Sequence, residues 1–166
     1  MEHLWAPWRK AYVQDSATPR GEIFSRLAQA PASDDAVNHI VLRGKACFAV
    51  LNRYPYNTGH TLVVPYRVVA DLDDLAEDEL LECLLVLKRV KAAIAAAFRP
   101  HGFNVGLNLG SAAGAGIEQH LHWHLVPRWN GDSNFMTATG DVRVHPSDLE
   151  TVHRLLAEKL LPAGAA

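Results

Sequence analysis

The feature that most constrains this chain is a ten-residue run, Gln-His-Leu-His-Trp-His-Leu-Val-Pro-Arg, at positions 119–128. Within it histidines alternate with apolar residues: His120, Leu121, His122, Trp123, His124 and Leu125. Strand side chains point alternately to two faces, so this period of two predicts a strand over residues 120–126, stopped by Pro127. The apolar residues then face a core and the imidazoles share the other face. Each imidazole brings two nitrogens that need partners, so three in register favour a functional face over an incidental solvated one.

Metal binding is one kind of chemistry that uses such a face. Neutral imidazoles are common zinc ligands. However, alternate residues on one strand lie about 6.6 Å apart and the outer pair roughly 13 Å apart, at a rise near 3.3 Å per residue. The outer rings therefore converge poorly on one ion, although two of the three could share an ion with a ligand from elsewhere. Cys47 and Cys83 are far apart and form no CxxC pair, which disfavours a thiolate zinc site or a disulfide scaffold. We expect no metal and no other cofactor.

Phosphate chemistry is the alternative that the histidine face favours. A neutral imidazole is a nucleophile at physiological pH, and its neighbours can donate hydrogen bonds to phosphate oxygens. The segment before the strand, residues 109–116, is rich in Gly, Ala and Ser. Such a loop lets backbone N–H groups approach an anion, although a plain tight turn explains the same composition. The histidine strand and this loop together indicate phosphate transfer through a phospho-histidine.

Composition excludes several other classes of protein. The chain has 166 residues, 49% of them hydrophobic and 20% charged, which suits one globular domain with its own core. Its formal net charge of −2 lacks the basic excess of dedicated nucleic-acid binders. No uncharged apolar run is long enough to span a membrane, and residues 1–10 lack the apolar segment of a signal peptide. We expect a cytoplasmic protein with neither nucleic acid nor membrane as a partner.

Local patterns predict an α+β domain in which one long helix packs on an antiparallel sheet and a second helix follows at the C-terminus. The expected elements are a helical turn at 23–27, a hairpin of strands 47–52 and 61–65, a helix from Asp73–Asp74 to about Arg99–Pro100, strands at 103–109 and 120–126, and a helix at 147–161 capped by Ser147. Residues 14–22, 30–37 and 110–116 read as loops. We expect a single domain over residues 1–166, with an N-terminal extension of about 1–20 and a C-terminal helical tail of about 147–166.

The histidine run resembles the signature of the histidine triad (HIT) superfamily of nucleotide hydrolases and transferases, in which three histidines alternate with apolar residues. The resemblance covers roughly residues 20–136. Residues 51–65 resemble the upstream hairpin of the family, and residues 103–110 resemble the strand before its triad loop. The runs at 4–9, 101–108 and 127–129 are similar to the bacterial branch that is diadenosine tetraphosphate phosphorylase-like.

The resemblance implies an enzyme that cleaves a nucleoside phosphate or a dinucleoside polyphosphate, such as diadenosine tetraphosphate, by phosphorolysis or hydrolysis. It implies His122 as the nucleophile that carries the nucleotidyl group, and His120 as the residue that orients it through a backbone carbonyl. It implies that His124 and His60 bind phosphate oxygens and assist the leaving group. Two alternatives stay open: a nucleoside phosphoramidase or adenylyl-conjugate hydrolase, and a nucleotide sensor or interaction module with weak turnover.

Substrate-binding residues follow from the same resemblance. It places Asn52 at the ribose hydroxyls, Asn108 at phosphate, and Ile23, Phe24 and Leu51 in a base pocket. From the residues alone, Asn52 could equally be a turn residue at a strand end, and His60 could cap a turn. Without the family, the three apolar residues read as core.

The chain departs from the family just before the triad. Many members have a polar side chain three or four residues before the first histidine, where this chain has Gly116 and Ile117. Ser111, Gln119 or the backbone N–H groups of 114–117 are the candidates to replace it. Some members hold a structural zinc on cysteines near the N-terminus, where this chain has residues 21–24 without cysteine, so we predict no zinc.

Members of the family commonly form homodimers through the long helix, and we expect a homodimer here. The candidate stripe is Leu80, Leu84, Leu87 and Val90, although core packing explains it equally well. By the same analogy, residues 134–136 reach the site of the partner subunit.

Overall fold

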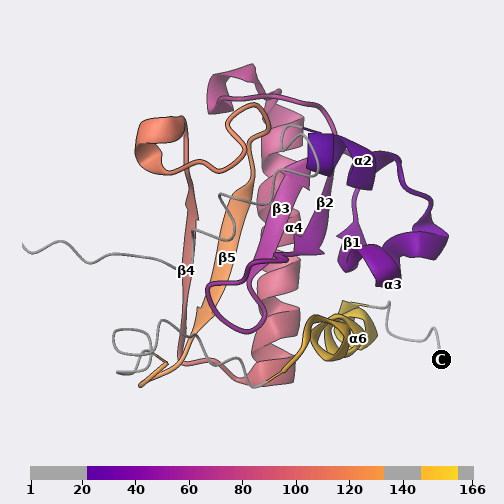
Figure 1. The fold of residues 1–166 in the computed structure, drawn as a ribbon, viewed down its shortest axis with the longest axis vertical. Coiled ribbons are helices and arrows are strands. Elements are labelled where there is room, and N and C mark those ends of the chain that lie inside the picture. The colour runs from indigo at the N-terminus through magenta and orange to yellow at the C-terminus, as the bar shows by residue number, and fades with distance from the viewer. Residues whose placement is uncertain (1–21, 133–146, 161–166) are drawn as a thin grey trace, which may run out of the picture.

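A five-stranded antiparallel sheet forms the centre of the computed structural model, which describes residues 22–132 and 147–160 (Figure 1). The strand order is β1-β2-β3-β5-β4, so β1 and β4 are the edges. The strands are β1 (Ile40–Arg43), β2 (Cys47–Leu51), β3 (Thr61–Pro65), β4 (Gly102–Leu107) and β5 (Trp123–Arg128). The helices are α2 (Ile23–Gln29), α3 (Asp35–Asn38), α4 (Glu77–Phe98) and α6 (Leu149–Leu160), with 3-10 turns η2 (Ala32–Asp34), η3 (Leu72–Asp74) and η4 (Ser111–Ala113).

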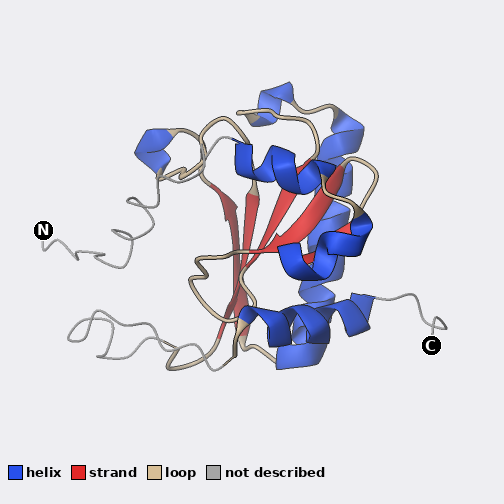
Figure 2. Ribbon diagram, turned by 45° about the vertical axis from the view of Figure 1, so that its right-hand side comes forward, coloured by secondary structure: helices blue, strands red, loops and turns tan. Residues whose placement is uncertain are grey.

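The long helix α4 covers one face of the sheet, and Figure 2 shows it running beside the strands. Its buried side chains, including Val90 and Ile94, pack with Leu121, Trp123 and Leu125 into the main core cluster. Helix α6 closes the same core and contacts both α4 and β1. This α+β arrangement confirms the predicted fold class, because the apolar members of the histidine run do face the core.

The opposite face carries a second, smaller cluster. Phe48 and Val50 of β2 and Leu62 and Val64 of β3 pack there against Phe24 of α2. The alternation of strand side chains explains the division, since their neighbours in sequence belong to the main cluster. The histidines alternate with Leu121, Trp123 and Leu125, so they lie on the side of this smaller cluster.

The histidine strand differs from its prediction at both ends. It begins at Trp123, three residues later than expected, so that His120 and His122 lie in the segment leading into β5. Pro127 does not stop the strand but lies inside it, paired with Phe103 of β4. The Pro127 carbonyl accepts from the side chain of Asn57, which lies in the turn before β3. The N and C=O of one strand residue face the same side, so the missing N–H costs no bond to β4.

Three other predicted element boundaries differ from those in the structure. The expected loop at 30–37 contains η2 and the start of α3, and strand β1 was not predicted at all. Asp73 and Asp74 lie in η3, and α4 begins only at Glu77, where the carboxylate of Glu79 accepts from the N–H of Ala76 at 2.9 Å. Asp148, rather than Ser147, caps α6 by accepting from the N–H of Thr151 at 2.7 Å.

The two cysteines meet in the main core although 36 positions separate Cys47 from Cys83. Both are buried free thiols. A hydrogen bond between the thiol of Cys47 and Cys83, together with burial, raises the pKa of Cys47. Two buried thiols in an apolar core behave as small hydrophobic side chains. The expected extension at 1–20 and the segment 134–136 lie outside the described residues.

Candidate active site

Four histidines gather where β5 begins. His60, His120 and His122 are 1%, 0% and 8% exposed, and His124 is half-buried. His60 directly precedes β3, and the pairing of β3 with β5 brings its ring to His124 across 64 positions of sequence. The structure therefore collects all four histidines that the sequence singled out.

The backbone of His120 holds the ring of His122. The Nδ1–H of His122 donates to the carbonyl of His120 at 2.9 Å, and the Nε2–H of His120 donates to the carbonyl of Pro65 at 2.8 Å. Burial lowers the pKa of both imidazoles, against a smaller opposing effect of those hydrogen bonds. Because a carbonyl can only accept, His122 has its proton on Nδ1 and a lone pair on Nε2. That is the nucleophilic form of the ring.

A second chain of hydrogen bonds fixes the tautomer of His124. The backbone N–H of Tyr56 donates to Nδ1 of His60 at 3.0 Å, so the proton of His60 lies on Nε2. This Nε2–H then donates to Nδ1 of His124 at 2.9 Å. The proton of His124 must lie on its Nε2, which makes that atom a hydrogen-bond donor. His122 and His124 thus present opposite functions, a lone pair and an N–H, on rings whose centroids are 5.0 Å apart.

The turn before β3 packs against the hydrogen-bonded histidines His60 and His124. The ring of Tyr56 stacks on His124, with centroids 5.9 Å apart and planes 8° apart, and lies 4.7 Å from the ring of His60. Asn52 accepts from the N–H of Tyr54 at 2.9 Å through Oδ1 and directs its Nδ2 to Nδ1 of His60 at 3.3 Å. Asn52 and His60 therefore do serve as turn residues, and His60 also reaches the site.

The three apolar residues of the expected base pocket do not come together. Phe24 is buried beside the histidines, with ring centroids 5.5 Å from His120 and 5.0 Å from His122. Ile23 packs partly buried on the same cluster. Leu51 belongs to the main core on the opposite face of the sheet, because strand alternation directs it toward α4. The structure does not support a place for Leu51 in a base pocket.

The residues between β4 and β5 have mixed surroundings. Asn108 is half-buried and lines a hollow together with His124. Ser111 and Gln119 are exposed, and Gly116 is half-buried. Gly110 and Gly114 take positive φ angles of 76° and 86°, which the absence of a Cβ makes easy. The loop therefore turns sharply beside the triad, as its composition indicates.

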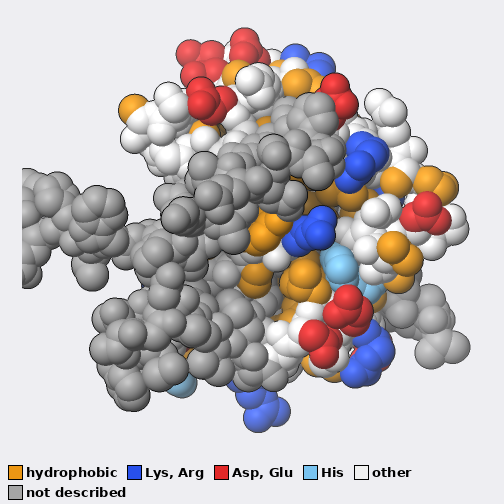
Figure 3. Space-filling model, in the orientation of Figure 1, with side chains coloured by type: hydrophobic (Ala, Val, Ile, Leu, Met, Phe, Trp, Pro, Cys, Tyr) orange, Lys and Arg blue, Asp and Glu red, His pale blue; other side chains and the backbone are white. Residues whose placement is uncertain are grey.

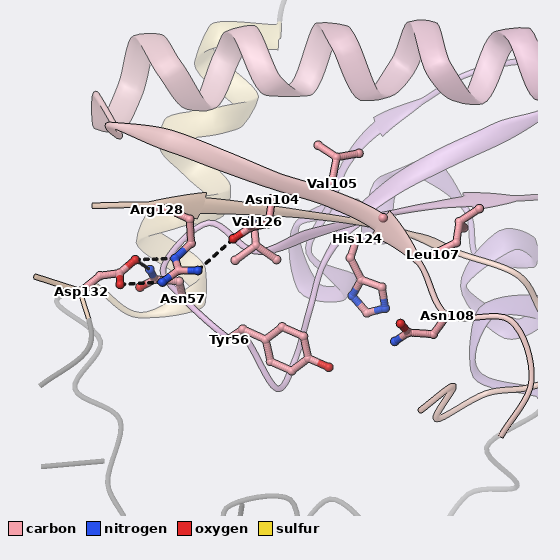
Figure 4. A pocket seen from close by; sticks show the side chains of 11 residues that line it. Tyr56, Asn57, Asn104, Val105, Leu107, Asn108, His124, Val126, Arg128 and Asp132 are labelled. Atoms are coloured by element: carbon pink, nitrogen blue, oxygen red, sulfur yellow. Dashed lines mark hydrogen bonds and ion pairs between the residues drawn. The ribbon is translucent and has the colours of Figure 1, made fainter. Parts of the chain in front are cut away.

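An open hollow of about 340 Å³ extends from His124 along β4 and β5 (Figure 4). At its far end the guanidinium of Arg128 pairs with Asp132, with an Nε–Oδ2 distance of 2.6 Å and an Nη2–Oδ1 distance of 2.9 Å. Asn57 donates to the same carboxylate at 2.8 Å, and Arg128 donates to Oδ1 of Asn104 at 2.8 Å. Arg128 holds the pKa of Asp132 down at about 2. Sequence reasoning missed this network, although opposite charges four positions apart after the triad were a usable signal.

Charge elsewhere is mixed. On the face drawn in Figure 3, basic side chains are scattered among acidic ones rather than gathered in one patch. Within residues 22–132 and 147–160, no group of three or more His, Cys, Asp or Glu side chains is arranged to hold a metal ion. The same ranges contain no helix that is both long and apolar enough to cross a bilayer.

An antiparallel α+β sheet with three histidines that alternate with core residues has the architecture of a histidine triad domain. The family model for the HIT domain matches residues 34–131. This match spans more than half of the chain, so the protein belongs to the HIT family.

Similar proteins extend the comparison to almost the whole chain. A Mycobacterium tuberculosis protein named AP-4-A phosphorylase is 43% identical over 162 residues, which cover 95% of this chain and 83% of that protein. The asymmetrical bis(5'-nucleosyl)-tetraphosphatase of Schizosaccharomyces pombe is 33% identical over 57% of this chain and 52% of its own length. Among solved structures, a zinc-bound histidine triad family protein from Mycobacterium smegmatis is 30% identical with a TM-score of 0.66, covering 83% of this chain and 91% of the other.

Proposed function

We propose that this HIT protein is an enzyme that cleaves dinucleoside polyphosphates, such as diadenosine tetraphosphate, through a nucleotidyl-histidine on His122. The observation that carries the proposal is the 2.9 Å hydrogen bond from Nδ1 of His122 to the His120 carbonyl, which leaves the lone pair of the ring on Nε2. The similarity to an AP-4-A phosphorylase over 95% of the chain supports the choice of substrate. Phosphate or water then accepts the nucleotidyl group.

In the first step the Nε2 lone pair of His122 attacks the α-phosphorus. A P–N bond forms, the bridging P–O bond breaks, and the leaving nucleotide departs with the electron pair of that bond. The Nε2–H of His124 donates a hydrogen bond to the oxygen on which negative charge develops. His60 keeps the proton of His124 on this atom by accepting from Tyr56 and donating to Nδ1 of His124. His60 is thus a positioning residue in this proposal.

In the second step an oxygen of phosphate or water attacks the same phosphorus. The P–N bond breaks and its electron pair returns to Nε2 of His122. From diadenosine tetraphosphate, hydrolysis gives AMP and ATP, whereas phosphorolysis gives ADP and ATP. Donors aimed at the phosphate oxygens stabilise the transition state, which explains how a site without a lysine cluster handles phosphates.

The substrate contacts are part of the proposal. Phe24 and Ile23 pack on the base, Asn52 contacts the ribose, and Asn108 contacts a phosphate. In place of the polar side chain of other members, backbone N–H groups around Gly116 contact the cleaved phosphate, with Ser111 or Gln119 as the side-chain candidates.

Product analysis tests the proposed function. The purified protein is incubated with diadenosine tetraphosphate, with and without inorganic phosphate, and the nucleotides are separated by chromatography. ADP that appears only with phosphate identifies phosphorolysis, and AMP identifies hydrolysis. Mass spectrometry of rapidly denatured protein should locate one adenylyl group on the peptide of residue 122. Absence of turnover with this substrate, or an adduct on another residue, contradicts the proposal.

We also propose that the protein forms a homodimer in the cytoplasm, with neither nucleic acid nor membrane as a partner. In the expected interface stripe, Leu87 and Val90 are buried in the core and only Leu84 is exposed. Leu87 and Val90 are therefore not available for an interface. Leu81, Leu84 and Leu85 of α4 and Val105 of edge strand β4 are the exposed apolar side chains that support an interface. Light scattering should give twice the chain mass, and Leu84→Arg should give monomers. A monomeric wild type contradicts the dimer.

A further inference from the structure

The hollow beside the triad is long and leads away from the reacting histidine. It begins at His124 and ends at Arg128, while His122 and Phe24 do not line it. His124 and Arg128 lie on the same face of β5 four positions apart, which places their Cα atoms roughly 13 Å apart at a strand rise near 3.3 Å. A single phosphate at His124 therefore does not also occupy the far end. Only an elongated ligand fills the hollow.

The far end presents a cation although Arg128 is paired with an acid. The side chain of Asp132 is 9% exposed and that of Arg128 is 45% exposed. Both oxygens of Asp132 accept hydrogen bonds, from Arg128, Asn57 and the backbone N–H of Trp129. The ion pair therefore buries its negative partner and leaves the positive one accessible.

Arg128 also retains hydrogen-bonding capacity. A guanidinium has five N–H donors in a planar fork. Three of them are used, two on Asp132 and one on Asn104, which leaves two for a ligand. In Figure 4 the ring of Tyr56 lies between Arg128 and His124. The wall of the hollow thus offers an aromatic ring, amide groups and two charged N–H donors, which suit a phosphate chain that carries a nucleoside.

We propose that Arg128 binds the phosphates distal to the cleaved bond, so that the hollow is the subsite for the leaving half of a dinucleoside polyphosphate. This inference rests on the proposed function, since the hollow leads away from the α-phosphate site at His122. The acceptor phosphate does not fit this role, because it must contact the phosphorus bonded to His122 and therefore sits at the near end. Arg128 then makes the enzyme prefer substrates with long leaving groups.

Substrate pairs test the inference through a specificity ratio. The kcat/KM is measured for diadenosine tetraphosphate and for the p-nitrophenyl ester of AMP, whose leaving group has no phosphate. Arg128→Gln should reduce the ratio of the first to the second by about tenfold or more, the size expected when a charged hydrogen bond is lost. Arg154→Gln on α6 removes an exposed arginine elsewhere and is the matched control, with an unchanged ratio. Equal losses on both substrates overturn the inference.

A second variant separates ligand binding from support of the neighbouring turn. Asp132→Asn breaks the same ion pair but keeps the guanidinium, so it should hold or increase the preference for the tetraphosphate. If Arg128 acts only by holding Asp132 and Asn57, both variants should instead lose activity on the two substrates together, and the inference is overturned.

The affinity for nucleotides tests the inference without any need for turnover. Calorimetry with wild type should show adenosine 5'-tetraphosphate binding more tightly than AMP, and Arg128→Gln should lose about tenfold of that difference. Equal affinities of the two nucleotides for wild type overturn the inference. A wild type that binds the tetraphosphate more tightly but turns over neither substrate contradicts the proposed function and leaves the distal subsite supported.

Discussion

On one face of the sheet Leu121, Trp123 and Leu125 pack against α4, while on the other His120 and His122 are buried to a similar degree. The apolar side chains lose nothing by leaving water, and their burial stabilises the fold. The histidines lose hydration, and the loss lowers the pKa of both rings. The same degree of burial therefore stabilises the fold on one face and favours neutral imidazoles on the other. Variants on the core face should therefore change stability, and variants on the histidine face should change activity.

Replacement of His122 should have the largest effect. His122→Ala removes the only atom proposed to bond to phosphorus, so kcat should fall by about 10⁴-fold or more, as when other covalent nucleophiles are removed. Steady-state kinetics with diadenosine tetraphosphate measures the loss. Nucleotide affinity should survive, and the circular dichroism spectrum should stay that of wild type. Full activity in this variant contradicts the mechanism.

Leu125 provides the opposite test on the core face. Leu125→Ala leaves a cavity beside α4 and should lower the free energy of unfolding by about 3 kcal/mol. Urea denaturation measures this change. The kcat per folded molecule, measured well below the midpoint of unfolding, should remain close to wild type. A loss of kcat as large as that of His122→Ala would show that the two faces are not separable.

Replacement of His60 should have an intermediate effect on activity. His60→Phe removes the Nε2–H that donates to His124, so the proton of His124 is no longer fixed on its Nε2. We expect kcat to fall by about 10²-fold, the lower range for loss of proton-transfer assistance. Tyr56→Phe keeps the backbone N–H and the ring, and it should stay within about twofold of wild type by the same rate assay. Equal losses in both variants would show that the hydroxyl of Tyr56 matters as much as the Nε2–H of His60, which contradicts the proposed role of the tautomer.

The smallest expected effect is the pH dependence of stability. His120 and His122 have lowered pKa values in the folded protein, whereas an unfolded histidine titrates near 6.5. Below about pH 6.5 the unfolded state therefore binds protons that the folded state does not, so stability falls as pH falls, by at most about 1.4 kcal/mol per pH unit for each histidine. Urea denaturation at several pH values between 5 and 8 measures the slope.

His120→Gln should make this slope shallower. The acid limb of kcat/KM should also lie below pH 6.5, because His122 keeps its lone pair there. Stability that stays constant over the range would mean that the two rings titrate as in the unfolded chain.

Much of the site could be predicted because its signal is local. Three histidines at alternate positions define a face without knowledge of the partner strands, and Thr61–Pro65 was bounded correctly because it is a compact β-branched run. The predictions that failed depended on distant contacts. Leu51 was placed in a base pocket by analogy, yet the pairing of β2 with β3 directs it to α4. Strand β1 and the continuation of β5 through Pro127 also depend on which strands lie next to them.

The sequence by itself determined the residue types of the site, the alternation that separates histidines from core, and the family. Only the tertiary structure decided which nitrogen of each ring carries the proton, since this depends on a carbonyl at His120, an N–H at Tyr56 and a ring at His60. It alone joined Arg128, Asp132 and Asn57 into one network. The reason is physical: side-chain chemistry belongs to each residue, whereas hydrogen-bond partners and burial belong to the neighbours that folding brings to it.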